Sequence, residues 1–364
     1  MKHLDEYRDP DLILRQVAAV QRACSRRWTL MEVCGGQTHA ILRHGLDRLL
    51  ADSVELLHGP GCPVCVTPPA ALDQAVALSR RPEVILCTFG DMLRVPGGLG
   101  DLNSARAAGG DVRVIYSPLD AVALAREHPD REVVLLAVGF ETTAPAAAVA
   151  VLQAAALGLA NLSLLVSHSL VPPAMAALLD DPDCRIQGFL AAGHVCTVDG
   201  AGPYRALAQH YRVPIVVTGF EPVDLLQGVL ACVQQLERGE ARVENRYARA
   251  AREHGNTAAR DAVERVFRPV EREWRGMGWL PASGLGLRPE YARFDALARF
   301  DADISAPTAS SPCIAGAVLR GQRRPTDCPA FGHQCTPDTP LGAPMVSSEG
   351  ACAAYMHYRG RDEA

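Results

Sequence analysis

Short runs of apolar residues recur along the first two thirds of the chain, each about as long as a buried strand. They lie at residues 30–33, 54–57, 84–87, 112–116, 133–138, 162–166, 186–191 and 215–217. Most are followed by a glycine-containing loop and then by a stretch rich in Ala and Leu that has helical periodicity. Because buried strands that alternate with helices are typical of parallel sheets covered by helices, the pattern predicts an α/β fold. The runs are numerous enough for two such sheets.

The length of 364 residues predicts two or three domains. We expect a first α/β domain at residues 1–120, with an N-terminal helix up to about Arg27, and a second at 121–235, with the break between the sheets near 117–131. From residue 236 the pattern changes. Charge rises through 249–268, which predicts a polar helix, and Pro, Gly and Cys become prominent from 279 to 350. Residues 236–364 are therefore expected to form a loop-rich third domain that needs a cofactor to hold its shape.

Composition narrows the classes of function. The formal net charge of -5 argues against non-specific binding to nucleic acid, which needs a basic surface. The N-terminal residues lack the apolar core of a secretory signal, and no run reaches the roughly 18 apolar residues of a membrane span. We therefore expect a cytoplasmic protein. Twelve cysteines in a reducing compartment favour metal binding or redox chemistry over structural disulfides.

The first candidate site is the segment Cys34-Gly35-Gly36-Gln37-Thr38-His39, which joins a predicted strand to a predicted helix at 38–50. A thiol beside the amide groups at the start of a helix is favoured as thiolate. His39 could carry a proton or act as a second ligand. The alternative is a buried structural cysteine with a histidine that caps the helix. The later segment Gly193-His194-Val195-Cys196 also follows a predicted strand and could line the same crevice.

The second candidate is the pair Cys62 and Cys65 in Gly61-Cys62-Pro63-Val64-Cys65. A Cys-x-x-Cys turn can close a reversible disulfide or hold a metal ion. Pro63 stiffens the turn, as in redox-active pairs. A structural zinc knuckle usually needs a second pair at similar spacing, and the sequence has none. The turn therefore favours thiol–disulfide chemistry.

The third candidate is a set of single cysteines in the Pro- and Gly-rich C-terminal segment, Cys313, Cys328, Cys335 and Cys352, with gaps of 14, 6 and 16 residues between them. Four thiolates that approach from separate loops suit a 4Fe–4S cluster. A zinc site with four thiolate ligands is the alternative.

Together these motifs resemble the HypD family of NiFe-hydrogenase maturation factors. The matching segments are 31–40, 58–68, 87–92, 139–145, 193–196, 218–222 and 328–355, so the resemblance follows nearly the whole chain in order. There are departures. The family commonly has a second thiol two residues after the position of Cys313, where this chain has Ala315, and some members have a cysteine at the position of Pro344. These losses leave four candidate ligands for a cluster.

The resemblance implies two parallel-sheet, Rossmann-like α/β domains around a cleft and a loop-rich helical iron–sulfur domain. It implies that Cys34 and a cysteine of a HypC-type small chaperone hold an iron centre that becomes Fe(CN)2CO, with cyanide from a HypE-type carrier. Cys62 and Cys65 would then be redox-active thiols beside a 4Fe–4S cluster. The expected function is that of a redox-active assembly factor with no nucleic-acid partner. The alternatives are a stand-alone thiol–disulfide oxidoreductase and a zinc-stapled binding module.

Overall fold

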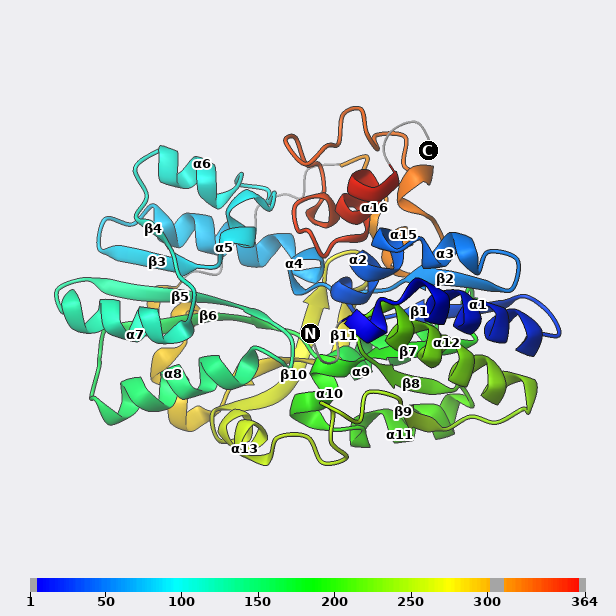
Figure 1. Ribbon diagram of the computed structural model, residues 1–364. Helices are drawn as coiled ribbons and strands as arrows, with labels where there is room; N and C mark the ends of the chain where they lie inside the picture. Colours follow the sequence, from blue (N-terminus) through cyan, green and yellow to red (C-terminus); the bar gives the residue numbers. More distant parts are fainter. Residues whose placement is uncertain (1–4, 302–310, 360–364) are drawn as a thin grey trace.

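Two parallel sheets covered by helices form the frame of the molecule, as the apolar runs predict (Figure 1). The computed structural model describes residues 5–301 and 311–359. The first sheet has the strand order β2 (Val54–His58), β1 (Trp28–Glu32), β7 (Gly188–Ala192), β8 (Ile215–Thr218) and β9 (Val243–Asn245). The second has the order β4 (Val112–Val114), β3 (Val84–Thr88), β5 (Glu132–Gly139) and β6 (Leu162–His168). Every strand pair in both sheets is parallel, so the predicted α/β class is confirmed.

The two sheets use the chain in an order that the apolar pattern does not reveal. The second sheet comes from one continuous stretch, whereas the first joins β1 and β2 to strands from much later in the chain. The break expected near 117–131 is wrong, because α7 (Pro118–Glu127) in this segment connects β4 to β5 of the same sheet. The division at residues 120 and 235 likewise separates strands that share a sheet. As a division into domains, it stays a prediction.

Most helices that cover the sheets begin where the sequence supplies a proline or a capping side chain, but α2 (Gly35–Arg43), α3 (Leu46–Leu49) and α10 (Gly193–Asp199) begin without either. Ser117 and Asp120 form a capping box at the start of α7. The alanine-rich run after Thr143 forms the buried helix expected there. The helices up to residue 237 are α1 (Pro10–Ala23), α2, α3, α4 (Pro63–Val66), α5 (Pro69–Ser79), α6 (Leu102–Ala107), α7, α8 (Ala144–Ala156), α9 (Val171–Leu179), α10, α11 (Gly202–Tyr211) and α12 (Pro222–Glu237).

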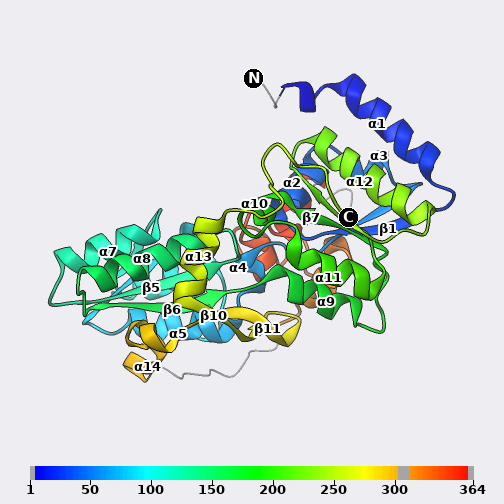
Figure 2. The same ribbon diagram turned by 90° about the horizontal axis from the view of Figure 1, so that it is seen from below.

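An antiparallel hairpin lies between the two sheets, where the sequence suggested only a polar helix and loops (Figures 1 and 2). It consists of β10 (Phe267–Trp274) and β11 (Gly278–Leu287), and the polar helix is shorter than expected, α13 (Thr257–Val266). The hairpin touches the second sheet through Arg272, which donates to the carbonyl of Val166 at 2.8 Å. Buried Trp274 stacks on Phe140, with ring centroids 5.9 Å apart. The hairpin therefore ties the two halves of the molecule together.

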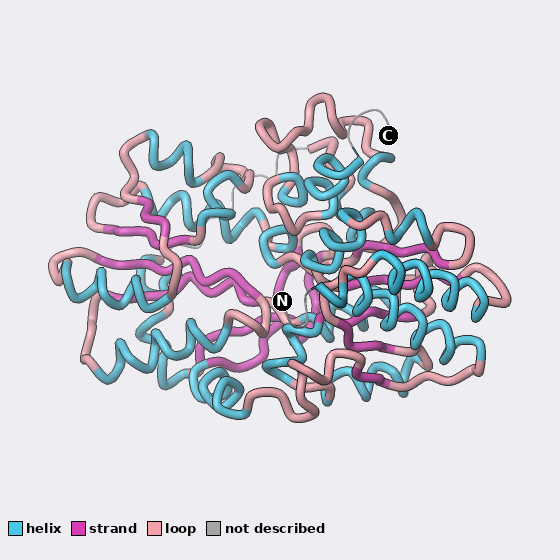
Figure 3. The backbone as a smooth tube through the Cα atoms, viewed as in Figure 1, coloured by secondary structure: helices cyan, strands magenta, loops and turns pink. Residues whose placement is uncertain are grey.

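The remaining elements are short. They are α14 (Ala296–Phe300), α15 (Ala315–Leu319) and α16 (Ala351–Arg359), with 3-10 turns between them that include Pro325–Asp327 and Ala343–Met345. The helices α15 and α16 lie above the first sheet in a segment that is mostly loop (Figures 1 and 3). This agrees with the loop-rich C-terminal segment that the sequence predicts. Within the described residues, no helix combines the length and the apolar character needed to cross a membrane.

The carboxyl ends of β1, β2, β7 and β8 meet at one edge of the first sheet. In the register of the sheet, Glu32 lies beside His58 and Leu190, and Ala192 lies beside Thr218. The loops that leave these strands therefore start side by side, although they are far apart in sequence. In open α/β sheets such an edge is where ligands bind.

Candidate functional site

Cys34 lies at the boundary between β1 and α2, where it is the N-terminal cap of the helix. Its backbone N–H donates to Glu32 Oε2 at 2.8 Å, and the next N–H, of Gly35, donates to the carbonyl of Gly61 at 2.9 Å. The side chain is 1% exposed. The hydrogen bonds of the Cys34 and Gly35 N–H groups therefore fix the turn that carries the Cys34 thiol.

Glu32 is the hub of these hydrogen bonds, although it is fully buried. Besides the Cys34 N–H, its carboxylate accepts His58 Nδ1 at 2.7 Å and a short hydrogen bond from the Thr38 hydroxyl. Three donors satisfy a buried carboxylate that would otherwise be costly to remove from water. The carboxylate therefore fixes the backbone that carries Cys34.

A histidine does meet the Cys34 thiol, but it is His194. The Cys34 sulfur lies 3.8 Å from each ring nitrogen of His194. The ring is stacked on Phe220, with centroids 5.1 Å apart, and burial lowers its pKa. A neutral imidazole that is held by an aromatic ring can accept the thiol proton.

Burial raises the pKa of the Cys34 thiol, so the thiolate that the sequence predicted is not favoured in the protein alone. Backbone amides of Gln37 and Gly36 at the start of α2 act in the predicted direction, but they are outweighed by burial and by the charges of Glu32 and Glu349. A metal cation or another positive group in the cleft would reverse this balance.

Cys62 and Cys65 lie at the start and in the body of the short helix α4, directly after β2. Both are buried, at 3% and 1% exposure, and both are free thiols. Burial raises the pKa of Cys65, and its hydrogen bond with Cys62 raises it further. The pair is therefore close enough to interact, as a redox pair must be.

The loop of the pair and the loop of Cys34 are packed backbone against backbone. A Cβ at Gly61 would lie 2.1 Å from the nitrogen of Cys34, so only glycine fits at this contact. The segment that carries Glu349 closes the other side, because a Cβ at Gly35 would lie 2.5 Å from Glu349 Cβ. The charge of Glu349 raises the pKa of both Cys34 and Cys65. The thiol of Cys34, the pair of Cys62 and Cys65 and the segment of Glu349 therefore lie next to one another.

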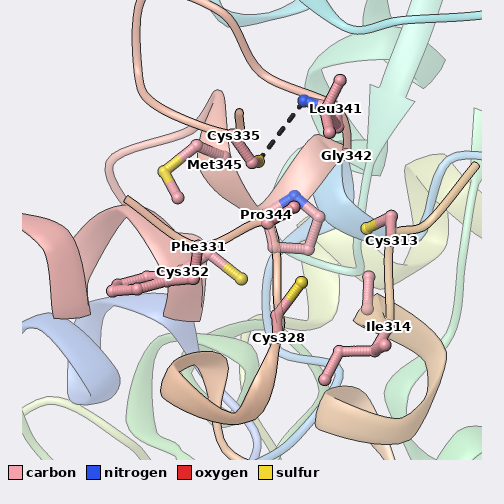
Figure 4. A pocket seen from close by; sticks show the side chains of 12 residues that line it. Cys313, Ile314, Cys328, Phe331, Cys335, Leu341, Gly342, Pro344, Met345 and Cys352 are labelled. Atoms are coloured by element: carbon pink, nitrogen blue, oxygen red, sulfur yellow. Dashed lines mark hydrogen bonds between the residues drawn. The ribbon is translucent and has the colours of Figure 1, made fainter. Parts of the chain in front are cut away.

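The four single cysteines line one small cavity within the C-terminal segment. Cys313 precedes α15, Cys328 follows the turn Pro325–Asp327, Cys335 lies in a loop and Cys352 in α16. The sulfur atoms of Cys313, Cys328 and Cys352 point into the space beside Pro344 (Figure 4). The other walls are mostly apolar, with Ile314, Ala315, Ala330, Phe331, Leu341, Gly342 and Met345.

The polar contacts of this cavity are made by the thiols themselves. The Leu341 N–H donates to Cys335 Sγ at 3.4 Å (Figure 4). Burial raises the pKa of Cys352, and the charges of Cys313, Cys335 and Cys328 raise it further, so the four sulfurs act on one another. In residues 5–301 and 311–359, no three His, Cys, Asp or Glu side chains are grouped closely enough to hold a single metal ion.

Comparison with known proteins identifies the family. The HypD family model, described as "Hydrogenase formation hypA family", matches residues 11–359. A "Hydrogenase maturation factor HypD" of Rhodobacter capsulatus is 48% identical over 99% of both chains. That of Escherichia coli K12 is 45% identical over 100% of this chain and 99% of its own. A "Hydrogenase expression/formation protein HupD" of Azotobacter chroococcum is 49% identical over 100% and 98%.

This chain belongs to the HypD family of hydrogenase maturation factors.

The structure brings together the HypD motifs that carry Cys34, Cys62 and Cys65, His194 and Glu349, but not the side chain of His39. His39 points away from Cys34 to α16, where its Nε2 lies 2.9 Å from the Tyr358 hydroxyl. Burial lowers its pKa. The contact joins α2 to α16, and a role of His39 in proton transfer or metal binding stays a prediction.

Three other residues of the site were not given a role from the sequence. Glu32 could have been noticed in the sequence, because it is an acidic residue inside the apolar run at residues 30–33. His58 directly precedes the Cys-x-x-Cys loop, and its Nε2 is buried without a partner. Phe220 follows a strand, but its stacking on His194 depends on the pairing of β7 with β8, which a single sequence does not show.

Proposed function

We propose that this protein, with a HypC-type chaperone, assembles the Fe(CN)2CO group of NiFe hydrogenase on Cys34 and uses Cys62 and Cys65 as a two-electron donor. The observation that carries the proposal is the packing of the Cys34 loop against the loop of the pair through Gly61. An iron held on Cys34 and a dithiol in the adjoining loop can take part in one reaction. Reduced thiols persist in a reducing compartment, so the proposal includes a cytoplasmic location.

The iron centre is the cargo of this reaction. Its binding would need the thiolate of Cys34, which the cation itself favours by its charge. His194 is placed to take the proton that leaves the sulfur, since its ring nitrogens lie 3.8 Å away. The second thiolate would come from the HypC-type chaperone.

Cyanide transfer from a thiocyanate on a HypE-type carrier needs two electrons. In the step that we propose, the S–C bond of the thiocyanate breaks, cyanide passes to iron, and the carrier sulfur is released as a thiol. Cys62 and Cys65 give up two electrons and two protons as their disulfide forms, so atoms and charge balance. One of these protons completes the carrier thiol and the other is released.

The four-cysteine cavity suits a 4Fe–4S cluster, with Cys313, Cys328, Cys335 and Cys352 as ligands. Four thiols from four segments, apolar walls and an N–H donor to one sulfur are the environment such a cluster requires. When bound, the cluster would supply electrons one at a time. A single zinc ion would need its four sulfurs within about 4 Å of one another, given a Zn–S distance of about 2.3 Å. A zinc site with the same four thiolate ligands is the alternative, and the identity of the bound metal distinguishes the two.

A stand-alone thiol–disulfide oxidoreductase is disfavoured by burial. Cys62 and Cys65 are 3% and 1% exposed, so a protein disulfide cannot reach them without opening of the cleft.

The proposal predicts separate losses in two variants of protein prepared without air. Cys34→Ala should keep the visible absorption of the cluster, with about four irons per chain, but lose the CO and CN infrared bands of the complex with the chaperone. Cys352→Ala should lose the cluster absorption, because it removes a ligand.

The matched control is Cys24→Ala, which changes a cysteine at the end of α1 and should keep both signals. Infrared bands that persist in Cys34→Ala would remove Cys34 from the assembly. A colourless wild-type protein that retains zinc would contradict the cluster.

A further inference from the structure

Arg275, at the tip of the β10–β11 hairpin, reaches from the hairpin to the helix of the paired thiols. Its backbone N–H donates to the carbonyl of Val66 at 2.8 Å, and its Nε donates to the carbonyl of Thr67 at 2.8 Å. A third hydrogen bond runs from Nη2 to the carbonyl of Pro96 at 3.0 Å. The residue thus holds the chain at the end of α4, directly after Cys65.

The same hairpin tip also touches the cysteine cavity. Gly276 has φ +79°, and a Cβ there would lie 2.6 Å from the Cα of Gly316, three residues after Cys313. In return, a Cβ at Gly316 would lie 2.8 Å from the carbonyl oxygen of Gly276. The turn is therefore the point where the hairpin meets the thiol pair on one side and the cavity wall on the other.

The guanidinium of Arg275 donates to two carbonyl groups, those of Thr67 and Pro96. Burial lowers its pKa, while the charges of Cys313 and Cys65, and after them those of Asp73 and Glu273, act on it in the opposite direction. A buried cation whose partners are carbonyls is costly unless negative charge develops nearby. In the proposed reaction, negative charge develops at Cys65, in the redox pair, and at Cys313, in the cluster cavity.

We propose that Arg275 is a positioning residue that holds the Cys62–Cys65 pair against the cluster cavity and, by its positive charge, favours the reduced form of the pair. This rests on the redox role of the pair in the proposed function. Reduction adds two electrons to the sulfurs, and a neighbouring cation stabilises any thiolate that forms. Loss of the charge should therefore shift the pair toward the disulfide.

The test is the equilibrium of the Cys62–Cys65 disulfide with dithiothreitol in the full, cluster-loaded chain, read by thiol alkylation and mass spectrometry. In this exchange the S–S bond of the protein breaks, and two electrons and two protons come from dithiothreitol, which closes to a cyclic disulfide. Arg275→Gln, which keeps a donor but loses the charge, should lower the equilibrium constant for reduction about tenfold, roughly 30 mV for a two-electron couple. Arg275→Lys, which keeps the charge, should stay within about threefold of the unchanged protein.

The matched control is Arg272→Gln. Arg272 lies in the same hairpin and also donates to carbonyls, those of Val166 and Leu285, but on the side of the second sheet. It should leave the equilibrium unchanged. An unshifted Arg275→Gln, or an Arg275→Lys shifted as far as Arg275→Gln, overturns the role of the charge. If the unchanged protein forms no Cys62–Cys65 disulfide at any ratio of oxidised to reduced dithiothreitol, the proposed function itself fails.

Discussion

At the scale of single residues, the site depends on buried polar groups that satisfy one another. Glu32 joins Cys34, Thr38 and His58, and it lies in a strand whose other buried side chains are apolar. The cysteines could be predicted from the sequence, because thiols in such motifs have few other uses in a reducing compartment. The protonation of Cys34 could not, because it depends on how deeply the thiol is buried. The contact of His194 with Cys34 could not be predicted either, because it depends on how the chain folds.

Because Glu32 accepts three hydrogen bonds, Glu32→Gln should make the folded protein markedly less stable. The amide has one acceptor oxygen where the carboxylate has two, so at least one of the three donors is left without a partner. We expect the free energy of unfolding to fall by about 2–3 kcal/mol, measured by urea denaturation without air.

The control for this variant is Glu83→Gln, which removes an exposed ion pair with Arg81 and should leave the free energy of unfolding nearly unchanged. A Glu32→Gln protein as stable as the Glu83→Gln protein would show that the hydrogen bonds to Glu32 do not hold the Cys34 turn.

At the scale of elements, the apolar runs located the strands of the two sheets up to residue 217, because buried parallel strands are continuous apolar stretches. The strands of the β10–β11 hairpin were not predicted, because they are not continuous apolar stretches. Its strands face the two sheets on one side and solvent on the other, so polar residues such as Arg268, Glu271 and Glu273 interrupt the pattern. The strand β9 is only three residues long, and its burial is partial throughout. Neither can be distinguished from a polar helix or loop by apolar content alone.

The contact between the two thiol loops gives a prediction at this scale. Gly61→Ala places a methyl group 2.1 Å from the Cys34 nitrogen, so the loops must separate. Overpacking of this kind costs about 1–3 kcal/mol, and the variant should also lose the CO and CN infrared bands while it keeps the cluster absorption.

Gly202→Ala is the matched control, because a Cβ at Gly202 meets nothing within 4 Å. It should leave stability and spectra unchanged. A Gly61→Ala protein with normal infrared bands would mean that the packing of these loops is not needed for assembly.

At the scale of the whole molecule, segments from four distant parts of the sequence meet above the first sheet. The Cys34 loop, the thiol pair, the hairpin tip and the C-terminal segment are neighbours, as the contacts at Gly35, Gly61 and Gly276 show. The sequence motifs indicated the family of this chain, but they did not show that the four segments lie next to one another in the fold. The first sheet is completed only when β7 pairs with β1, and a pairing of strands so far apart leaves no local signal in a single sequence.

The central claim, that the lone thiol and the four-cysteine cavity both hold iron within one cleft, is tested most directly by anomalous X-ray scattering. Crystals of the anaerobically prepared complex with the HypC-type chaperone would be measured on both sides of the iron edge and of the zinc edge. We predict iron density within the cavity of Cys313, Cys328, Cys335 and Cys352 and a separate iron at the sulfur of Cys34. Zinc density in the cavity, or iron that contacts none of these five sulfurs, would contradict the account.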